Sequence, residues 1–267
     1  MYNFTFHRPT GLRQAGNMLG KLEEAKILAG GQTLIPTMKL RLASPNNIID
    51  LNAIADELSG IELKGRSIVI GAMTRHADVA NSDVVKQNLP ALAYLAGLVG
   101  DPAVRHRGTL GGSIANNDPN SDYPAAALGL GATIHTTKGK HAADDFFKGL
   151  FETALAPDEI ITKVSFPIVK KAGYEKFRNQ ASRFALVGVF VSKRGSEIRV
   201  AVTGAGANGV FRLPSFEEAL KKRFAPKSLE GMTIPADGMA SDIHGSAEYR
   251  AHLVGVLARR AVAAAVA

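Results

Sequence analysis

Two pairs of adjacent glycines, Gly30-Gly31 and Gly111-Gly112, narrow the range of folds that this chain can adopt. The first pair directly follows a short apolar run, 26–29, that we expect to form a buried strand. Glycine allows positive φ and lets backbone N–H groups converge without a Cβ in the way, and Thr33 adds a hydroxyl donor. This pattern is typical of a phosphate-binding concavity, although a tight turn between strand and helix is the simpler interpretation of the pair taken alone.

The second pair is bracketed by hydroxyl side chains, Thr109 and Ser113, inside a segment rich in Gly, Asn and Asp. We expect the segment 100–124 to be a long loop, and such loops in compact domains are often functional. Asp122 precedes Tyr123-Pro124, where its carboxylate can accept hydrogen bonds from sugar hydroxyls, cap a helix, or do both. Two glycine loops, each suited to an anion, together predict one pyrophosphate held from two sides.

The apolar pattern along the chain predicts a mixed α+β fold. Leu12, Ala15, Met18, Leu19 and Leu22 fall on one face of a helix. We expect strands at 26–29, 47–51, 61–63, 67–70, 132–136, 160–166, 184–191 and 197–203. We expect helices at 10–25, 75–98 (with a start at Pro90), 144–155, 215–224 and 246–264.

Composition excludes several classes of function. There is no cysteine, so the chain cannot form a disulfide, a thiolate nucleophile, a Cys-ligated zinc site or an iron–sulfur cluster. The seven histidines are scattered without the spacing that places two ligands on one helix face, so we expect no metal site. No Ser/His/Asp triad, paired catalytic carboxylates or phosphate-loop lysine stands out, and we expect no catalytic side chain. Any redox chemistry therefore falls to an organic cofactor.

The charge distribution and the hydropathy of the chain argue against binding to nucleic acid and against a membrane span. The net charge of +8 is spread out, with short clusters at Lys221-Lys222-Arg223 and Arg259-Arg260, so we expect solvated faces or an acidic protein partner and no nucleic acid. No apolar run is long enough for a membrane span. The start of the chain carries no apolar signal sequence, so we expect a cytoplasmic location.

The stretch Gly204-Ala205-Gly206-Ala207-Asn208-Gly209 matches the GxGxxG dinucleotide pattern after an expected strand. That pattern requires a helix to open at its last glycine, with the pyrophosphate at the helix N-terminus. Here residues 210–214 intervene and end in Pro214. We interpret the stretch as a glycine-rich turn.

The order of the motifs resembles the medium, FAD-binding subunit of molybdenum hydroxylases, especially the carbon monoxide dehydrogenase branch. The residues that carry the resemblance are Ala29-Gly30-Gly31-Gln32-Thr33, Thr109-Leu110-Gly111-Gly112-Ser113, Asn116-Asn117-Asp118-Pro119 and Asp122-Tyr123-Pro124. It extends over the full length through Gly71-Ala72 with Thr74, the segments 159–167 and 174–183, and the late segment 242–250. The resemblance implies the flavin-binding fold of p-cresol methylhydroxylase and vanillyl-alcohol oxidase, with a C-terminal domain added. The implied domains are a first FAD-binding lobe at 1–58, a second lobe at 59–167 and a C-terminal domain at 168–267.

The resemblance also implies the cofactor and its contacts. Residues 29–33 and 109–113 would hold the pyrophosphate of one non-covalent FAD, and Asp122 would contact the ribityl or ribose region. Ile161 would lie near the isoalloxazine through its backbone, and Lys176 would reach the polar edge of the cofactor. Phe184 stands where related chains often have a tyrosine near the flavin face, so stacking would survive and a hydroxyl would be lost. The full set of implied contacts is Ala29, Gly30, Gly31, Gln32, Thr33, Leu34, Thr109, Gly111, Gly112, Ser113, Asn116, Asp122, Ile161, Lys176 and Phe184. We expect valine at Gly31 or Gly111 to weaken FAD binding while the chain still folds.

The implied role is electron transfer within a complex. A large molybdopterin subunit would oxidise the substrate, and a small subunit with 2Fe–2S clusters would pass electrons to this FAD and on to an external acceptor. The expected assembly is a dimer of heterotrimers, with molybdopterin and clusters only on the partners. Two alternatives stay open at this point: a stand-alone flavin oxidoreductase that acts directly on a small molecule, and a scaffold whose glycine loops are only turns.

Overall fold

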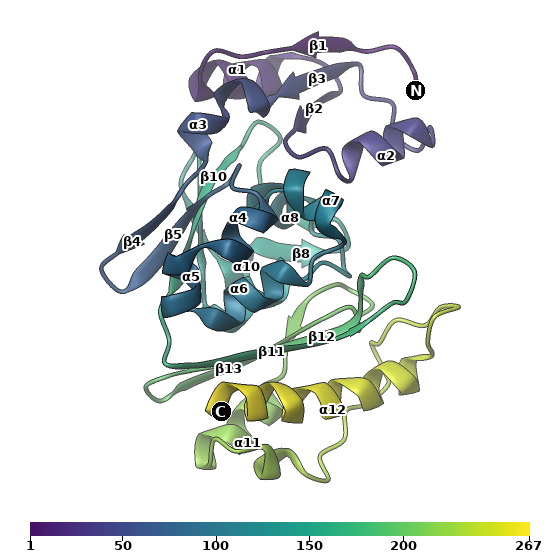
Figure 1. Cartoon of the computed structure of the whole chain (residues 1–267). Helices are drawn as coiled ribbons and strands as arrows, with labels where there is room; N and C mark the ends of the chain where they lie inside the picture. Colours follow the sequence, from purple (N-terminus) through teal and green to yellow (C-terminus); the bar gives the residue numbers. More distant parts are fainter.

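The computed structural model describes residues 1–267, and its sheets follow one another from the N-terminus to the C-terminus (Figure 1). The first sheet is parallel with the order β1-β3-β2. Its elements are β1 (Thr5–His7), α1 (Leu12–Lys21), β2 (Ala25–Leu28), α2 (Leu34–Lys39), β3 (Asn47–Asp50), the 3-10 helix η1 (Leu51–Ile54) and α3 (Ala55–Leu58). Ala15 of α1 packs against Ile49 of β3, with Leu12, Met18, Leu19 and Leu22 beside them. The predicted apolar face of this helix is therefore confirmed.

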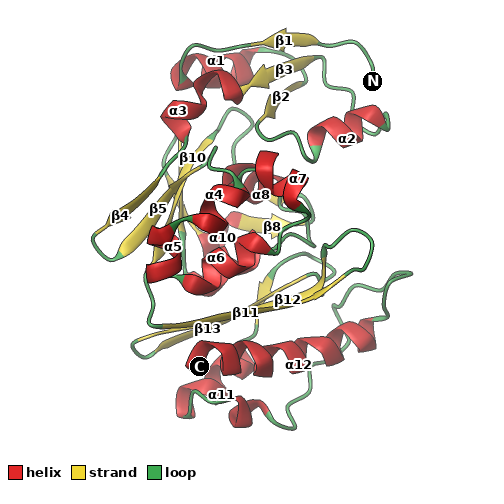
Figure 2. Ribbon diagram, viewed as in Figure 1, coloured by secondary structure: helices red, strands yellow, loops and turns green.

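The middle sheet is antiparallel with the order β4-β5-β10-β6-β7, and its central strand is the last of the five in the chain. The strands are β4 (Ile61–Lys64), β5 (Ser67–Gly71), β6 (Thr133–Thr136), β7 (Lys140–Ala142) and β10 (Ile161–Pro167). The helices are α4 (His76–Asn81), α5 (Asp83–Asn88), α6 (Pro90–Gly97), α7 (Pro102–Arg107), α8 (Leu110–Asn116), α9 (Tyr123–Leu130) and α10 (Ala143–Phe146). Figure 2 shows most of these helices gathered beside the sheet, and residues of both form the largest apolar core.

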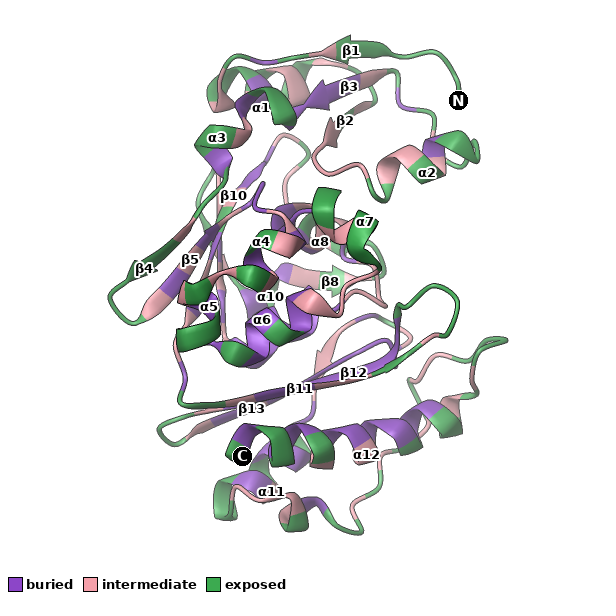
Figure 3. Ribbon diagram, in the orientation of Figure 1, coloured by how far each residue is buried: buried purple, intermediate pink, exposed green.

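The C-terminal sheet has the order β11-β12-β13-β14 and is covered on both faces. Its elements are β11 (Lys171–Arg178), β12 (Ala185–Arg194), β13 (Glu197–Thr203), β14 (Phe211–Arg212), α11 (Pro214–Lys222), the 3-10 helix η2 (Pro226–Leu229) and α12 (Ala247–Val266). Phe190 of β12 packs into the middle core, whereas Val187 and Val189 pack against α12. Residues 185–192 are consequently all buried, as the purple stretch of β12 in Figure 3 shows.

Two sequence expectations are wrong. The helix expected at 144–155 stops at Phe146 and gives way to the hairpin of β8 (Phe147–Gly149) and β9 (Glu152–Thr153). The Asn117 amide donates to the carbonyls of Gly149 and Glu152, both at 2.8 Å, and so holds the hairpin turn. A tertiary contact has overridden the local helical pattern.

The segment expected as one long loop, 100–124, instead contains α7 and α8 and the start of α9. The Asp101 carboxylate accepts from the Val104 amide at 2.9 Å, and the Thr109 hydroxyl accepts from the Gly112 amide at 3.2 Å. These two side chains cap α7 and α8, which stabilises short helices in a glycine-rich stretch. The region 75–98 is helical as expected but divides into α4, α5 and α6, with Pro90 in the first turn of α6.

The overall α+β class is confirmed, and no helix in the structure is long and apolar enough to span a membrane. The GxGxxG stretch at 204–209 is a turn, as predicted. Strand β14 follows it, and α11 begins only at Pro214.

Candidate functional site

The two glycine segments lie against each other in the structure. A Cβ built on Gly30 would be 2.2 Å from the carbonyl oxygen of Arg107 and 2.7 Å from the Cα of Gly108. A Cβ on Gly112 would lie 3.8 Å from the Cβ of Ala29. Only a residue without a side chain allows the backbone after β2 to approach the backbone before α8 so closely. The predicted meeting of the two motifs is therefore observed.

The first segment presents unpaired backbone donors. The N–H groups of Gly30 through Leu34, which we call the amide nest, find no acceptor within the chain. Gly31 has φ +73°, in the left-handed region that turns successive N–H groups to one side. Ala29, Gly30, Gly31 and Leu34 are half-buried, and Gln32 and Thr33 are exposed. A concave row of free donors that stays open to solvent fits the oxygens of a pyrophosphate.

The second segment differs, because its first amides are used within the chain. The Leu110 amide donates to the Thr74 carbonyl at 3.0 Å and the Gly111 amide to the Ala72 carbonyl at 2.8 Å. The Gly112 amide donates to the Thr109 hydroxyl. A row of free backbone amides, which the predicted anion cradle requires, is thus present in the first segment and not at Leu110 to Gly112 of the second. One turn further along α8, the side chains of Ser113 and Asn116 are half-buried and make no hydrogen bond within the chain.

Gly111 is required for packing against Ala72. A Cβ built there would be 2.5 Å from the Cβ of Ala72 and 2.8 Å from its carbonyl oxygen. Gly31 has positive φ, and a Cβ there would be 2.6 Å from the Ile35 side chain. Valine at either position therefore strains the chain itself, so weaker FAD binding in these two variants would not by itself locate the pyrophosphate.

Asp122 and Lys176 form a buried ion pair between α9 and β11. The Lys176 ammonium donates to Asp122 Oδ2 at 2.9 Å and to the Leu98 carbonyl at 3.1 Å, and the Tyr174 hydroxyl donates to Asp122 Oδ1 at 2.5 Å. The side chains of Lys176 and Asp122 are only 2% and 4% exposed. Burial raises the pKa of Asp122, and the charge of Lys176 partly offsets that rise. The Asp122 side chain makes no capping hydrogen bond to α9, so the helix-cap interpretation fails.

Spare hydrogen-bonding capacity remains in this pair. An ammonium carries three donors and Lys176 uses two of them within the chain. Each carboxylate oxygen of Asp122 accepts one hydrogen bond and has a further lone pair. The arrangement therefore fits an additional contact from either residue to the polar part of a cofactor.

Ile161 lies in the middle sheet, and Phe184 lies in the loop that precedes β12. Ile161 is buried in β10, beside a break in the register of its pairing with β6. Phe184 is 45% exposed just before β12, and the amide of the next residue, Ala185, donates to the Asn120 carbonyl at 3.3 Å. Phe184 therefore lies beside the segment that leads into Asp122. An exposed aromatic ring at this place is available to cover a planar ligand.

A buried histidine, which no sequence pattern indicated, lies beneath the second glycine segment. The His76 amide donates to the Gly108 carbonyl at 3.0 Å, and a Cβ built on Gly108 would be 2.7 Å from His76 Nε2. The imidazole lies against the Tyr123 ring with centroids 5.3 Å apart. His76 Nδ1 and the Tyr123 hydroxyl are both buried without a partner. Burial, with a smaller contribution from Arg105, lowers the pKa of His76 to about 4, so the ring is neutral at pH 7.

The amide nest is the kind of site at which proteins that bind nucleotides hold phosphate groups. The chain belongs to the family described as "FAD binding domain in molybdopterin dehydrogenase", whose profile matches residues 2–169. The resemblance seen in the glycine motifs is therefore confirmed, as is the prediction of an FAD-dependent oxidoreductase subunit.

Similar proteins cover nearly the whole chain. The carbon monoxide dehydrogenase medium chain of Hydrogenophaga pseudoflava is 36% identical, over 98% of this chain and 96% of the relative. The nicotine 6-hydroxylase medium subunit of Paenarthrobacter nicotinovorans is also 36% identical, over 95% of this chain and 94% of the relative. A solved structure of reconstituted CO dehydrogenase from Oligotropha carboxidovorans superposes with a TM-score of 0.87 at 34% identity, over 99% of this chain and 98% of that chain.

Proposed function

We propose that the amide nest binds the pyrophosphate of FAD and that α8 supports it through side chains. The nest supplies backbone donors from residues 30–34, and the Thr33 hydroxyl adds one more. Ser113 and Asn116 supply polar groups from the facing segment, where the amides of Leu110 to Gly112 are already used. The free row of amides at the meeting of the two glycine segments is the observation that carries this proposal.

The rest of the proposed site positions the two ends of the flavin. Asp122 accepts from ribityl or ribose hydroxyls, and Lys176 uses its remaining donor toward the polar edge of the ring. Ile161 lies near the ring through its backbone, and Phe184 covers a face of it. The burial of Asp122 supports its role, because the hydroxyl groups of the ribityl or ribose part need acceptors that are held in place. The exposure of Phe184 supports its role, because a planar ring needs an apolar side chain to cover it.

We propose three domains, 1–58, 59–167 and 168–267, with a vanillyl-alcohol oxidase type of fold in the first two. Each part holds one of the three sheets that have three or more strands, and most of one apolar cluster, which supports the division. Bound FAD supplies the redox chemistry that links an iron–sulfur donor to an external acceptor. The side chains of this chain hold the cofactor, exclude water from its buried edge and fix its orientation.

The proposed setting is a cytoplasmic complex with a large molybdopterin subunit and a small 2Fe–2S subunit, as a dimer of heterotrimers. Family membership and the similarity to medium chains and subunits support it. The absence of cysteine supports it too, because the cluster ligands must then come from another chain.

The test is the double variant Thr33→Val/Ser113→Ala. Neither side chain makes a hydrogen bond within the chain, so the free energy of unfolding of the apoprotein should stay unchanged. Loss of two hydroxyl contacts should raise the Kd for FAD on the order of tenfold. Thr233→Val/Ser215→Ala removes two other exposed hydroxyl groups and serves as the control. Equal FAD affinity in wild type and the Thr33/Ser113 variant would place the pyrophosphate elsewhere.

A further inference from the structure

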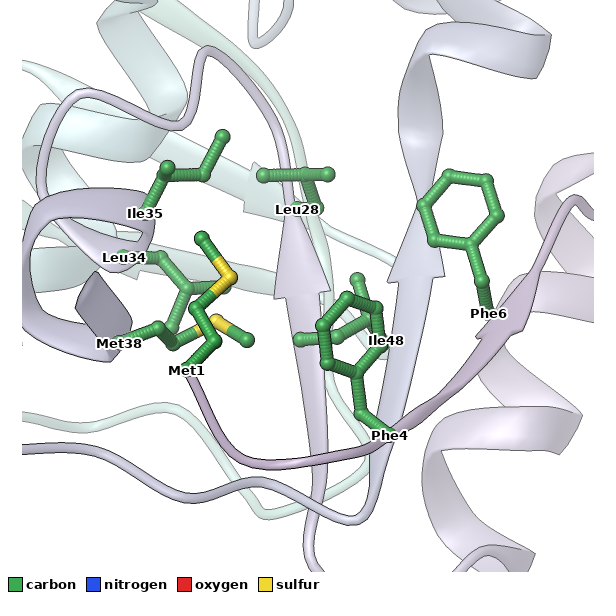
Figure 4. Close-up of a pocket in the computed structure, with 8 residues that line it drawn as sticks. All are labelled: Met1, Phe4, Phe6, Leu28, Leu34, Ile35, Met38 and Ile48. Atoms are coloured by element: carbon green, nitrogen blue, oxygen red, sulfur yellow. The ribbon is translucent and has the colours of Figure 1, made fainter. Parts of the chain in front are cut away.

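The parallel sheet leaves one face only partly covered. Helix α1 packs on the face that carries Ile49, whereas Phe4, Phe6, Leu28 and Ile48 project from the opposite face. Figure 4 shows these side chains with those of α2 around a hollow of about 220 Å³, which we call the apolar hollow. All eight side chains that line it are apolar. None of them is part of the amide nest except Leu34, which contributes its backbone there.

Two of the rings that line the hollow are exposed, and so are two leucines that follow α2 in the sequence. Phe4 and Phe6 are 39% and 49% exposed, and Leu40 and Leu42 at the end of α2 are 70% and 76% exposed. Exposed aromatic rings around an apolar hollow are seldom left on a protein surface unless another molecule covers them. This concentration therefore indicates an interaction surface.

The hollow suits protein side chains better than a small ligand. Ligand pockets usually have a volume of roughly 300–1,000 Å³ and contain a few placed polar groups. The apolar hollow is smaller and has no polar lining residue. One or two apolar side chains of another chain match that size and chemistry.

The rim of the hollow is basic. Lys26 lies two residues before Leu28 in β2 and therefore on the same face of the sheet. Arg8 and Lys39 are close in sequence to Phe6 and Met38, which line the hollow. The Arg41 guanidinium lies 5.6 Å from the centroid of the Tyr2 ring. All four cations are exposed, and none takes part in an ion pair of the structure. There is one carboxylate nearby: Glu24 and Arg41 both line a neighbouring polar hollow.

A second copy of this chain would bring the same cations face to face, which is unfavourable. A segment with apolar side chains at its centre and carboxylates around them would satisfy both the hollow and the rim. We propose that the apolar hollow and its basic rim dock such an acidic, apolar segment of a partner subunit. The docking proposal rests on the proposed function, because it requires the chain to be part of a complex.

The test measures assembly of the FAD-loaded full chain with its co-expressed large and small subunits. Phe4→Ser/Phe6→Ser removes two exposed rings from the hollow, and Lys39→Glu/Arg41→Glu reverses two rim charges. Each should weaken assembly at least tenfold while FAD content stays that of wild type. The loss in the charge variant should shrink as salt concentration rises. Leu63→Ser and Lys222→Glu/Arg223→Glu change exposed residues elsewhere and should assemble as wild type.

Unchanged assembly in both hollow variants would overturn the docking proposal. So would loss of FAD on substitution of Phe4 and Phe6, which would assign the hollow to the cofactor, or a dimer of the isolated chain that these variants dissociate. A wild-type chain that binds neither FAD nor the other subunits would instead overturn the proposed function, and with it the docking proposal.

Discussion

At the scale of single residues, His76 links the stability of the fold to pH. Its ring is buried against Gly108 and Tyr123, and its pKa is lowered to about 4 from an ordinary value of 6.5. The unfolded chain therefore takes up a proton at a higher pH than the folded chain. This histidine contributes stability that is present above pH 6.5 and is lost as pH falls toward 4.

We predict a loss of about 3 kcal/mol in the free energy of unfolding between pH 7 and pH 4 from this residue. His76→Gln should flatten that part of the pH dependence, because glutamine does not titrate. Urea unfolding at several pH values measures the slope. His106→Gln, at an exposed position two residues before Gly108, is the control and should keep the wild-type slope. Identical slopes for His76→Gln and wild type would show that folding does not lower the pKa of His76.

Gly30 gives the second prediction at this scale. Alanine there would place a Cβ 2.2 Å from the Arg107 carbonyl oxygen and force the two glycine segments apart. We expect the Kd for FAD of Gly30→Ala to rise more than tenfold, since the nest and α8 would no longer face one ligand together. Gly16→Ala in α1 meets no neighbour and should leave FAD binding intact while adding about 1 kcal/mol of stability. Titration with FAD, followed by flavin fluorescence, distinguishes the two variants.

At the scale of elements, the buried pair of Lys176 and Asp122 joins β11 to α9 and so joins the C-terminal sheet to the middle core. Lys176→Met would leave Asp122 buried without its cation. We predict a loss of about 3 kcal/mol in unfolding free energy. The double variant Lys176→Met/Asp122→Asn should lose less than the sum of the single variants, because it removes both charges. Strict additivity in denaturant unfolding would contradict the pairing, and Lys170→Met on the surface is the control.

The same scale shows where sequence patterns suffice. The periodic spacing from Leu12 to Leu22 is sufficient to predict α1, and the glycine pair after β2 is sufficient to predict the turn that forms the amide nest. Both features depend only on residues that are close together in the sequence. The hairpin at 147–153 depends on the side chain of Asn117, and the requirement for Gly111 depends on Ala72. Residues that distant in sequence leave no local pattern. The pairing of Asp122 with Lys176 was missed for the same reason, although both residues were predicted site residues.

At the scale of the whole molecule, the chain should not oxidise a hydroxylase substrate by itself. We predict that the isolated FAD-loaded chain, mixed without oxygen with carbon monoxide, purines, aldehydes or N-heterocycles, keeps its flavin absorbance. Bleaching should appear when the partner subunits are restored and the cognate substrate is present. Bleaching of the isolated chain at about 1 per second or faster would show direct oxidation and favour a stand-alone flavin oxidoreductase.

The central position of β10 in the middle sheet also sets the order of events during synthesis. This strand pairs with β5 on one side and with β6 on the other. The Thr162 carbonyl of β10 accepts a hydrogen bond from the Ala72 amide, and the Ala72 carbonyl accepts one from the Gly111 amide. The ribosome must therefore produce residues 161–167 before the middle sheet can close around the second glycine segment, although that segment emerges much earlier. Contacts between distant residues of this kind form late and slowly. A nascent chain stalled before β10 would expose the apolar residues of β5 and α9 to aggregation and chaperones, and cofactor loading would have to wait until nearly two-thirds of the polypeptide has left the ribosome.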